Sequence, residues 1–198
     1  MEKIVVNDTN VFIDLHDVGL LEQFFLLPWE VHTTDFVMLE LVKEGQKDTV
    51  AAYESNGCLH IATFEFQEVV KINKLHKAII NKSNLSLTDC SVWYYAKQNN
   101  YTLLTGDRKL RNSALNEGVE VRGIIYVFDE LVANGIIPAS LAAEKLTLLK
   151  SINPRLPEND IDFEIYSKNP CMRISIQTLT ELLGIGSNAA TSPSQQRP

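Results

Sequence analysis

Apolar residues along this chain alternate between short β-branched runs and longer stretches with helical spacing. The first run, Lys3 to Asn7, predicts a buried strand that leads through Asp8 into a helix. Further strands are expected at 31–33, 58–64, 101–105 and 119–121. Because helical segments separate these strands, we predict an α/β fold whose parallel sheet is covered by helices on both faces.

The helices are marked by apolar spacing together with capping and breaking residues. One helix begins at Thr34 or Asp35 and carries Glu40, and Ser86-Leu-Thr-Asp89 has the form of a capping box. The other helices are expected near 9–14, 20–27, 47–54, 69–80, 90–98, 108–116, 124–132 and 139–152. We predict a compact domain over 1–138, a helical and proline-rich extension over 139–170, and a tail over 171–198 that ends in disorder.

Composition narrows the class of protein. The 198 residues suit one domain with an appendage, and the 45% hydrophobic content is ordinary for a soluble protein. No apolar run approaches the ~20 residues that span a bilayer, and the N-terminus has no signal-peptide pattern, so we expect a cytoplasmic protein without membrane contact. The net charge of −7 argues against a broad nucleic-acid surface but not against a local basic patch.

Cysteine and histidine give no sign of a disulfide framework or a zinc site. The three cysteines lack C-x-x-C spacing, and the four histidines show no pairing at helical spacing. Each histidine is expected to be a surface or half-buried residue and not a ligand. The histidines are His16, His32, His60 and His76.

Four separated acids are the candidate chemistry. Asp8 and Asp107 follow predicted strands, and ligand sites of parallel sheets lie at the carboxyl ends of strands. Asp89 opens a helix, and Glu40 lies in the apolar run 36–42. Each has a structural alternative, because the three aspartates suit helix caps and Glu40 could face solvent.

Taken together, the acids favour a metal site. A carboxylate cluster without cations repels itself, and hard divalent cations remove that repulsion. Four carboxylates would balance two such ions, and two ions about 3.5–4 Å apart can activate a water and stabilise the leaving oxygen of a phosphodiester.

Four segments in this order resemble the PIN-domain nucleases. They read V-V-N-D-T-N-V-F-I-D, L-E-L, L-S-L-T-D-C-S-V-W-Y-Y-A-K, and Y-T-L-L-T-G-D-R-K-L-R followed by G-V-E-V-R-G. The likeness covers roughly residues 3–136 and extends to the bacterial PIN proteins that serve as VapC-type toxins of type II toxin–antitoxin pairs. It implies a three-layer α/β/α fold and a ribonuclease (an endonuclease) that uses Mg²⁺ or Mn²⁺.

The resemblance also assigns roles. It makes Asp8, Glu40, Asp89 and Asp107 the catalytic and metal-binding set, with Asn10 and Thr105 supporting them through hydrogen bonds. It implies an RNA substrate, a small antitoxin as partner and a homodimer. The acidic, proline-rich segment after residue 150 lies outside the family core.

Three readings stay open from the sequence. The first is the nuclease, and the second is a non-catalytic PIN module that binds RNA or a protein. The third, a phosphoacceptor domain, is disfavoured because Asn7 stands where such domains carry an adjacent acid.

Basic residues directly after Asp107 are candidate RNA contacts of the predicted nuclease. Arg108, Lys109 and Arg111 would contact phosphate or form a solvated helix face. The aromatics at 93–95 are expected in the core and not as base-stacking groups.

Overall fold

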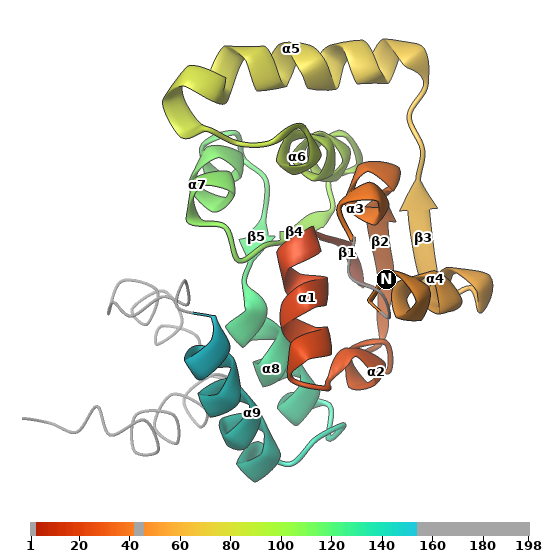
Figure 1. The fold of residues 1–198 in the computed structure, drawn as a ribbon, viewed down its shortest axis with the longest axis vertical. Helices are drawn as coiled ribbons and strands as arrows, with labels where there is room; N and C mark the ends of the chain where they lie inside the picture. The colour runs from red at the N-terminus through yellow and green to blue at the C-terminus, as the bar shows by residue number, and fades with distance from the viewer. Residues whose placement is uncertain (1–2, 42–45, 154–198) are drawn as a thin grey trace, which may run out of the picture. The chain divides into compact units, whose positions relative to one another are not determined.

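The structure is a computed structural model that describes residues 3–41 and 46–153 (Figure 1). The predictions for the proline-rich segment from residue 154 onward and for the tail over 171–198 lie outside the described residues. Among the described residues, no helix is long and apolar enough to cross a membrane.

The centre of the fold is a five-stranded sheet in which every pairing is parallel. Its order is β3-β2-β1-β4-β5, so β1 lies between β2 and β4. The strands are β1 Lys3–Asn7, β2 Trp29–Thr34, β3 Leu59–Ala62, β4 Thr102–Leu104 and β5 Val121–Arg122. The predicted parallel sheet is confirmed, and its central strand is the β-branched run at the start of the sequence.

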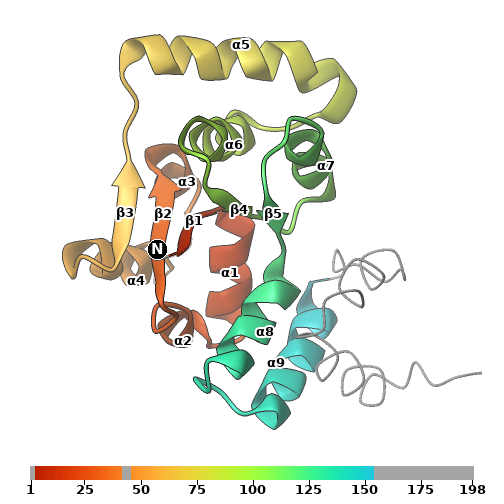
Figure 2. The ribbon, with the colours of Figure 1, turned by 180° about the vertical axis from the view of Figure 1, so that it is seen from behind.

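Helices cover both faces of the sheet, which gives the predicted three-layer α/β/α arrangement. Figures 1 and 2 show α6 and α7 on one side with α5 beyond α6, and α1, α2 and α8 on the other with α9 beyond α8. The helix α6 packs across β1, β2 and β4. The helices are α1 Thr9–Asp17, α2 Leu21–Phe24, α3 Asp35–Glu40, α4 Gln46–Ser55, α5 Phe66–Ser83, α6 Leu87–Asn99, α7 Arg108–Asn116, α8 Ile124–Ala133 and α9 Ala139–Ile152.

Local capping explains several helix starts. The hydroxyl of Thr34 accepts the Val37 amide, so Thr34 and not Asp35 is the N-cap of α3. The capping box predicted at the start of α6 is present, and α7 has the bounds expected from the sequence. The last strand is shorter than expected and contains only Val121 and Arg122.

Burial corrects one expectation and confirms another. His32 is only 4% exposed, whereas the histidines were expected at the surface or half-buried, because β2 is an inner strand of the sheet. Trp93 and Tyr94 are buried as core residues, as expected. The helix α9 packs on α8 and buries Leu146 and Leu149.

Candidate functional site

The candidate site lies at the carboxyl ends of β1 and β4. These two strands are neighbours, and the Asp8 amide donates to the Leu104 carbonyl at 3.0 Å. Asp8 directly follows β1 and Asp107 follows β4 after a two-residue turn. The fold therefore brings together two acids that stand 99 positions apart in the sequence.

Asp8 is buried and its carboxylate is held from three sides. Its side chain is 1% exposed. Oδ1 accepts the Thr9 amide at 2.7 Å, while Oδ2 accepts the Thr105 hydroxyl at 2.8 Å and the Asn10 side-chain amide at 3.3 Å. Asn10 and Thr105, which the resemblance named as hydrogen-bonding residues, therefore both donate to the Asp8 carboxylate.

Thr105 connects two of the acids. Its hydroxyl donates to Asp8 and accepts the backbone amide of Asp107 at 3.0 Å. The side chain is fully buried, so both bonds are shielded from water. One hydroxyl therefore fixes the Asp8 carboxylate relative to the turn that carries Asp107.

Asp89 and Asp107 both cap helices, as the structural alternative predicted. Asp89 Oδ2 accepts the Ser86 amide at 2.7 Å in the capping box of α6. Asp107 Oδ1 accepts the amides of Lys109 and Leu110 at 2.7 and 2.8 Å at the start of α7. Capping does not exclude a second role, because a carboxylate that caps a helix keeps further lone pairs for other ligands.

Glu40 corrects an argument made from the sequence. It lies in an apolar run, but the side chain is exposed at the last residue of α3 and not buried among its neighbours. Glu40 Oε2 accepts the Thr9 hydroxyl at 2.9 Å, which brings it to the residue after Asp8. Its place beside the other acids, and not a buried charge, is what connects Glu40 with the site.

Electrostatics show that the acids lie near one another. Burial and, to a smaller extent, the charge of Asp89 raise the pKa of Asp8 to about 7, against the hydrogen bonds from Thr105, Asn10 and Thr9, which lower it. Burial also raises the pKa of Asp89, with smaller contributions from Asp107 and Glu40, while Ser86 lowers it. The four carboxylates therefore form one repelling cluster, in which Asp89 interacts with the other three.

The cluster fits some metal ions better than others. Its donors are hard carboxylate oxygens whose mutual repulsion a divalent cation would relieve. Within the described ranges, however, no three acid, histidine or cysteine side chains converge closely enough to enclose an ion. This donor set suits Mg²⁺ or Mn²⁺, since Mg²⁺ keeps several waters and takes only one or two protein carboxylates.

The three predicted RNA contacts differ in position. Arg108 and Lys109 are exposed at the start of α7, next to Asp107. Arg111 is half-buried, and its Nη2 lies 3.5 Å from the Thr105 carbonyl and beside Gly123. The structure thus turns Arg111 toward the sheet, where it supports the turn behind the acids.

Sequence reasoning missed three polar residues at or near the strand and helix ends that carry Asp8. Thr9 joins Asp8 to Glu40, and its position inside D-T-N was the available signal. Asn7 is fully buried at the end of β1, and its side-chain amide has no protein partner in the described part of the chain. Asp14 is buried and accepts the Asn153 side chain at 2.9 Å, which ties the end of α9 to α1. For Asn7 and Asp14, nothing in the sequence pattern separated the residue from an ordinary turn or core position.

Comparisons with known proteins complete the picture of the site. A family model described as "PIN domain" matches residues 4–163. Among solved structures, the chain is similar to VapBC2 from Rickettsia felis bound to a DNA fragment from its promoter (14% identity, TM-score 0.43, 61% of this chain and 98% of that one). It is also similar to FitAcB from Neisseria gonorrhoeae (16% identity, TM-score 0.38, 59% of this chain and 95% of that one). No curated protein sequence matches this chain.

Proposed function

The chain belongs to the PIN-domain family, and we propose that it is an endoribonuclease that needs Mg²⁺ or Mn²⁺. The observation that supports this most is the gathering of four acids at the carboxyl ends of β1 and β4, where their charges repel. In this proposal Asp8, Glu40, Asp89 and Asp107 hold the metal. When bound, divalent ions orient and activate a water and stabilise the leaving oxygen of a phosphodiester.

The other residues keep the acids in place before substrate arrives. Thr105 and Asn10 hold the Asp8 carboxylate, and the helix starts of α6 and α7 hold Asp89 and Asp107. Because these bonds form on folding, little ordering of the acids is left for the binding step. Arg108 and Lys109 are placed to contact the backbone of the RNA.

A cleavage assay with matched variants tests this function. Purified protein should cut single-stranded RNA in Mg²⁺ or Mn²⁺ and not in EDTA. Asp8→Asn should lower the rate at least ~100-fold, because it removes a charge from the metal set while keeping a side chain that can cap α1. Glu54→Gln on α4 changes an exposed acid away from the site and should leave the rate unchanged. Cleavage that survives both EDTA and Asp8→Asn would rule out the assignment.

A toxin role is the narrower form of the proposal. It is supported by the motif order shared with VapC-type PIN proteins, and it includes a small antitoxin partner, a homodimer and a cytoplasmic location. Co-expression with the product of the neighbouring short reading frame tests the partner, and light scattering of the purified chain tests the dimer. If the chain binds no such product, the proposed antitoxin partner is wrong, and the protein is a nuclease that does not belong to a toxin–antitoxin pair.

One observation favours a second candidate, a PIN module that binds RNA or protein without cutting. Within the described residues, three ligands do not converge around a common point. Calorimetry with Mn²⁺ separates the two functions, since an intact site should bind the ion and Asp107→Ala should weaken that binding. Undetectable binding at millimolar Mn²⁺ together with absent cleavage would favour the second candidate.

A further inference from the structure

We infer that the outer face of α5 binds the backbone and bases of single-stranded RNA and leads it toward the acidic site; this rests on the proposed function. The face is made of three lysines and an aromatic residue, Lys71, Lys74, Lys77 and Phe66, which we call the α5 face. It is not part of the site described above, and its residues are not among the contacts expected from the sequence.

Charge is concentrated on this helix in an acidic protein. The chain has a net charge of −7, yet the stretch from Val69 to Thr88 contains four lysines, one histidine and no acid. Lys71, Lys74 and Lys77 are exposed, and within the described ranges no carboxylate pairs with them. By contrast, Lys97 and Arg122 each pair with a glutamate. The α5 face therefore carries cations that the fold leaves available to a partner.

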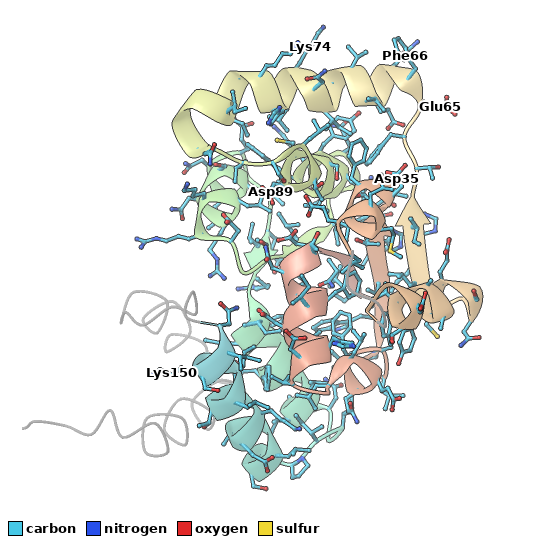
Figure 3. The ribbon with its side chains drawn as sticks, viewed as in Figure 1. Asp35, Glu65, Phe66, Lys74, Asp89 and Lys150 are labelled. Atoms are coloured by element: carbon cyan, nitrogen blue, oxygen red, sulfur yellow. The ribbon has the colours of Figure 1, made fainter. Side chains whose placement is uncertain are left out.

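Helix geometry puts these lysines on one side. Ile72 is fully buried where α5 packs on α6. At about 100° per residue, Lys71, Lys74 and Lys77 fall on the half of the helix centred opposite Ile72. Figure 3 shows Lys74 and Phe66 on the side of α5 that faces away from α6. The lysines cover about 9 Å along the helix axis, so one strand of nucleic acid can contact all three.

Phe66 provides the second half of the recognition. It is the first residue of α5 and is 80% exposed, more than any other large apolar side chain among the described residues. Phe66 has no role in the helix cap, which Glu65 and Glu68 form through their side chains and amides. An exposed aromatic ring near a row of cations is the arrangement that binds single strands, since bases stack on the ring while cations contact phosphates.

RNA fits this face better than a protein does. Protein interfaces are depleted in lysine and depend on buried aromatic or aliphatic anchors. The α5 face is lysine-rich, and its ring stands at one end and not at the centre. Phosphate is the partner for which exposed, unpaired lysines are the usual ligands.

The position of α5 connects it with the acids. The C-terminal end of α5 is linked by only three residues to α6, whose first turn holds Asp89. Ser83 Oγ lies 3.5 Å from Ser113 Oγ, so the same end of α5 meets the C-terminal half of α7. A strand that leaves this end of α5 can therefore follow α6 to Asp89, or run along α7 from Ser113 back to its start at Asp107.

Binding measured without metal tests the inference separately from cleavage. The protein is titrated into a fluorescent single-stranded oligoribonucleotide in EDTA at several salt concentrations. Lys74→Gln combined with Lys77→Gln should weaken binding about tenfold and reduce the salt slope by about 1.4, or ~0.7 for each lost phosphate contact. The matched control, Lys145→Gln with Lys150→Gln on α9, removes the same charge and should leave both values unchanged.

Phe66→Ser should weaken binding severalfold at an unchanged salt slope, because it removes stacking and no charge. Because Phe66 is highly exposed, the substitution removes no core packing, and thermal melts of all variants check that they fold. Equal affinity and slope for the α5 and α9 double variants overturns the inference, as does tighter capture of an acidic peptide than of RNA. Cleavage in Mn²⁺ is measured in parallel. If the α5 variants cut RNA at the wild-type rate, the proposed nuclease function stands and RNA binding by the α5 face is wrong.

Discussion

The two ends of the sheet differ in how neighbouring charges act on an ionisable side chain that is partly or fully buried. At the amino ends, Lys3 Nζ donates to the Tyr126 hydroxyl at 2.5 Å and lies over the rings of Trp29 and Tyr126. Burial lowers the pKa of Lys3, and the charges of Glu120 and Glu130 counter that shift. At the carboxyl ends, burial raises the pKa of Asp8 and the neighbouring charge of Asp89 adds to the shift.

We interpret this difference as one between a stabilising cluster and the proposed functional site. At the amino end, two glutamates counter the cost of holding a half-buried cation. At the carboxyl end, the charge of Asp89 adds to the cost of burying an anion, and the hydrogen bonds from Thr105, Asn10 and Thr9 offset that cost only in part. Active sites are where groups with uncompensated, shifted pKa values collect, and proteins give up stability to keep them. The comparison therefore predicts how each end responds to mutation, pH and metal.

The largest effect is expected at Asp8. Its folded pKa of about 7 lies above the unfolded value of 3.8, so ionisation destabilises the fold progressively from about pH 4 to 7 and fully above pH 7. Asp8→Asn should raise the free energy of unfolding by up to about 4 kcal/mol at pH 8 without metal, and by almost nothing near pH 3.5. Urea melts at both pH values measure this. Mg²⁺ should reduce the difference in stability between wild type and Asp8→Asn at pH 8. Equal stability of the two proteins at pH 8 without metal would mean that neighbouring groups already stabilise the ionised carboxylate.

The opposite result is expected at Trp29. Its ring stacks on Tyr126 at 5.8 Å and meets Phe24 edge-on at 6.1 Å. Trp29→Ala should cost about 2–3 kcal/mol through lost packing. The loss should be the same in EDTA and in Mg²⁺, and the same at pH 6 and pH 8. A metal-dependent loss in the urea midpoint would contradict the separation of the two ends.

A smaller change should follow at Thr105. Thr105→Val keeps the shape but removes the hydroxyl that donates to Asp8, at a cost of about 1 kcal/mol. Losing this bond should also raise the pKa of Asp8, so the pH at which cleavage reaches half its maximum should move upward. Thr105→Ser keeps the hydroxyl and should restore the wild-type profile. If Thr105→Val leaves the pH dependence of cleavage unchanged, Thr105 contributes only packing.

The smallest effect should come from His32, which lies between the two ends. Burial lowers its pKa, against a favourable contact with Glu30. The unfolded chain therefore binds a proton that the folded chain does not, and stability should fall as the pH drops below about 6.5. His32→Gln should remove this part of the acid sensitivity in thermal melts recorded from pH 5 to 7.5. Unchanged sensitivity would assign it to other groups.

The sequence was sufficient where one rule decides the outcome. Chain order and the parallel sheet placed Asp8 and Asp107 at neighbouring strand ends, because β-branched runs separated by helices leave few other topologies. The cap at Asp107 fixed the start of α7, since a side chain that accepts two amides marks the boundary directly.

The sequence was insufficient where contacts between distant elements decide. The exposure of Glu40 depends on how α3 ends beside α1, which no local pattern of apolar residues encodes. His32 is buried because β2 is an inner strand, and strand order follows from pairing energies across the whole sheet. The exposure of Phe66 likewise reflects where α5 meets α6, which the apolar spacing of the helix alone does not determine.

The capping roles of Asp8 and Asp107 have a genetic consequence. Asparagine caps a helix as well as aspartate does, and a single transition in the first base of an aspartate codon produces it. Under the proposed function, a gene encoding this chain can thus lose its chemistry in one step while the protein keeps its shape and its surfaces. Such an inactive variant would fold normally and could still bind a partner or a nucleic acid, so it is the kind of homologue that a single mutation produces most easily.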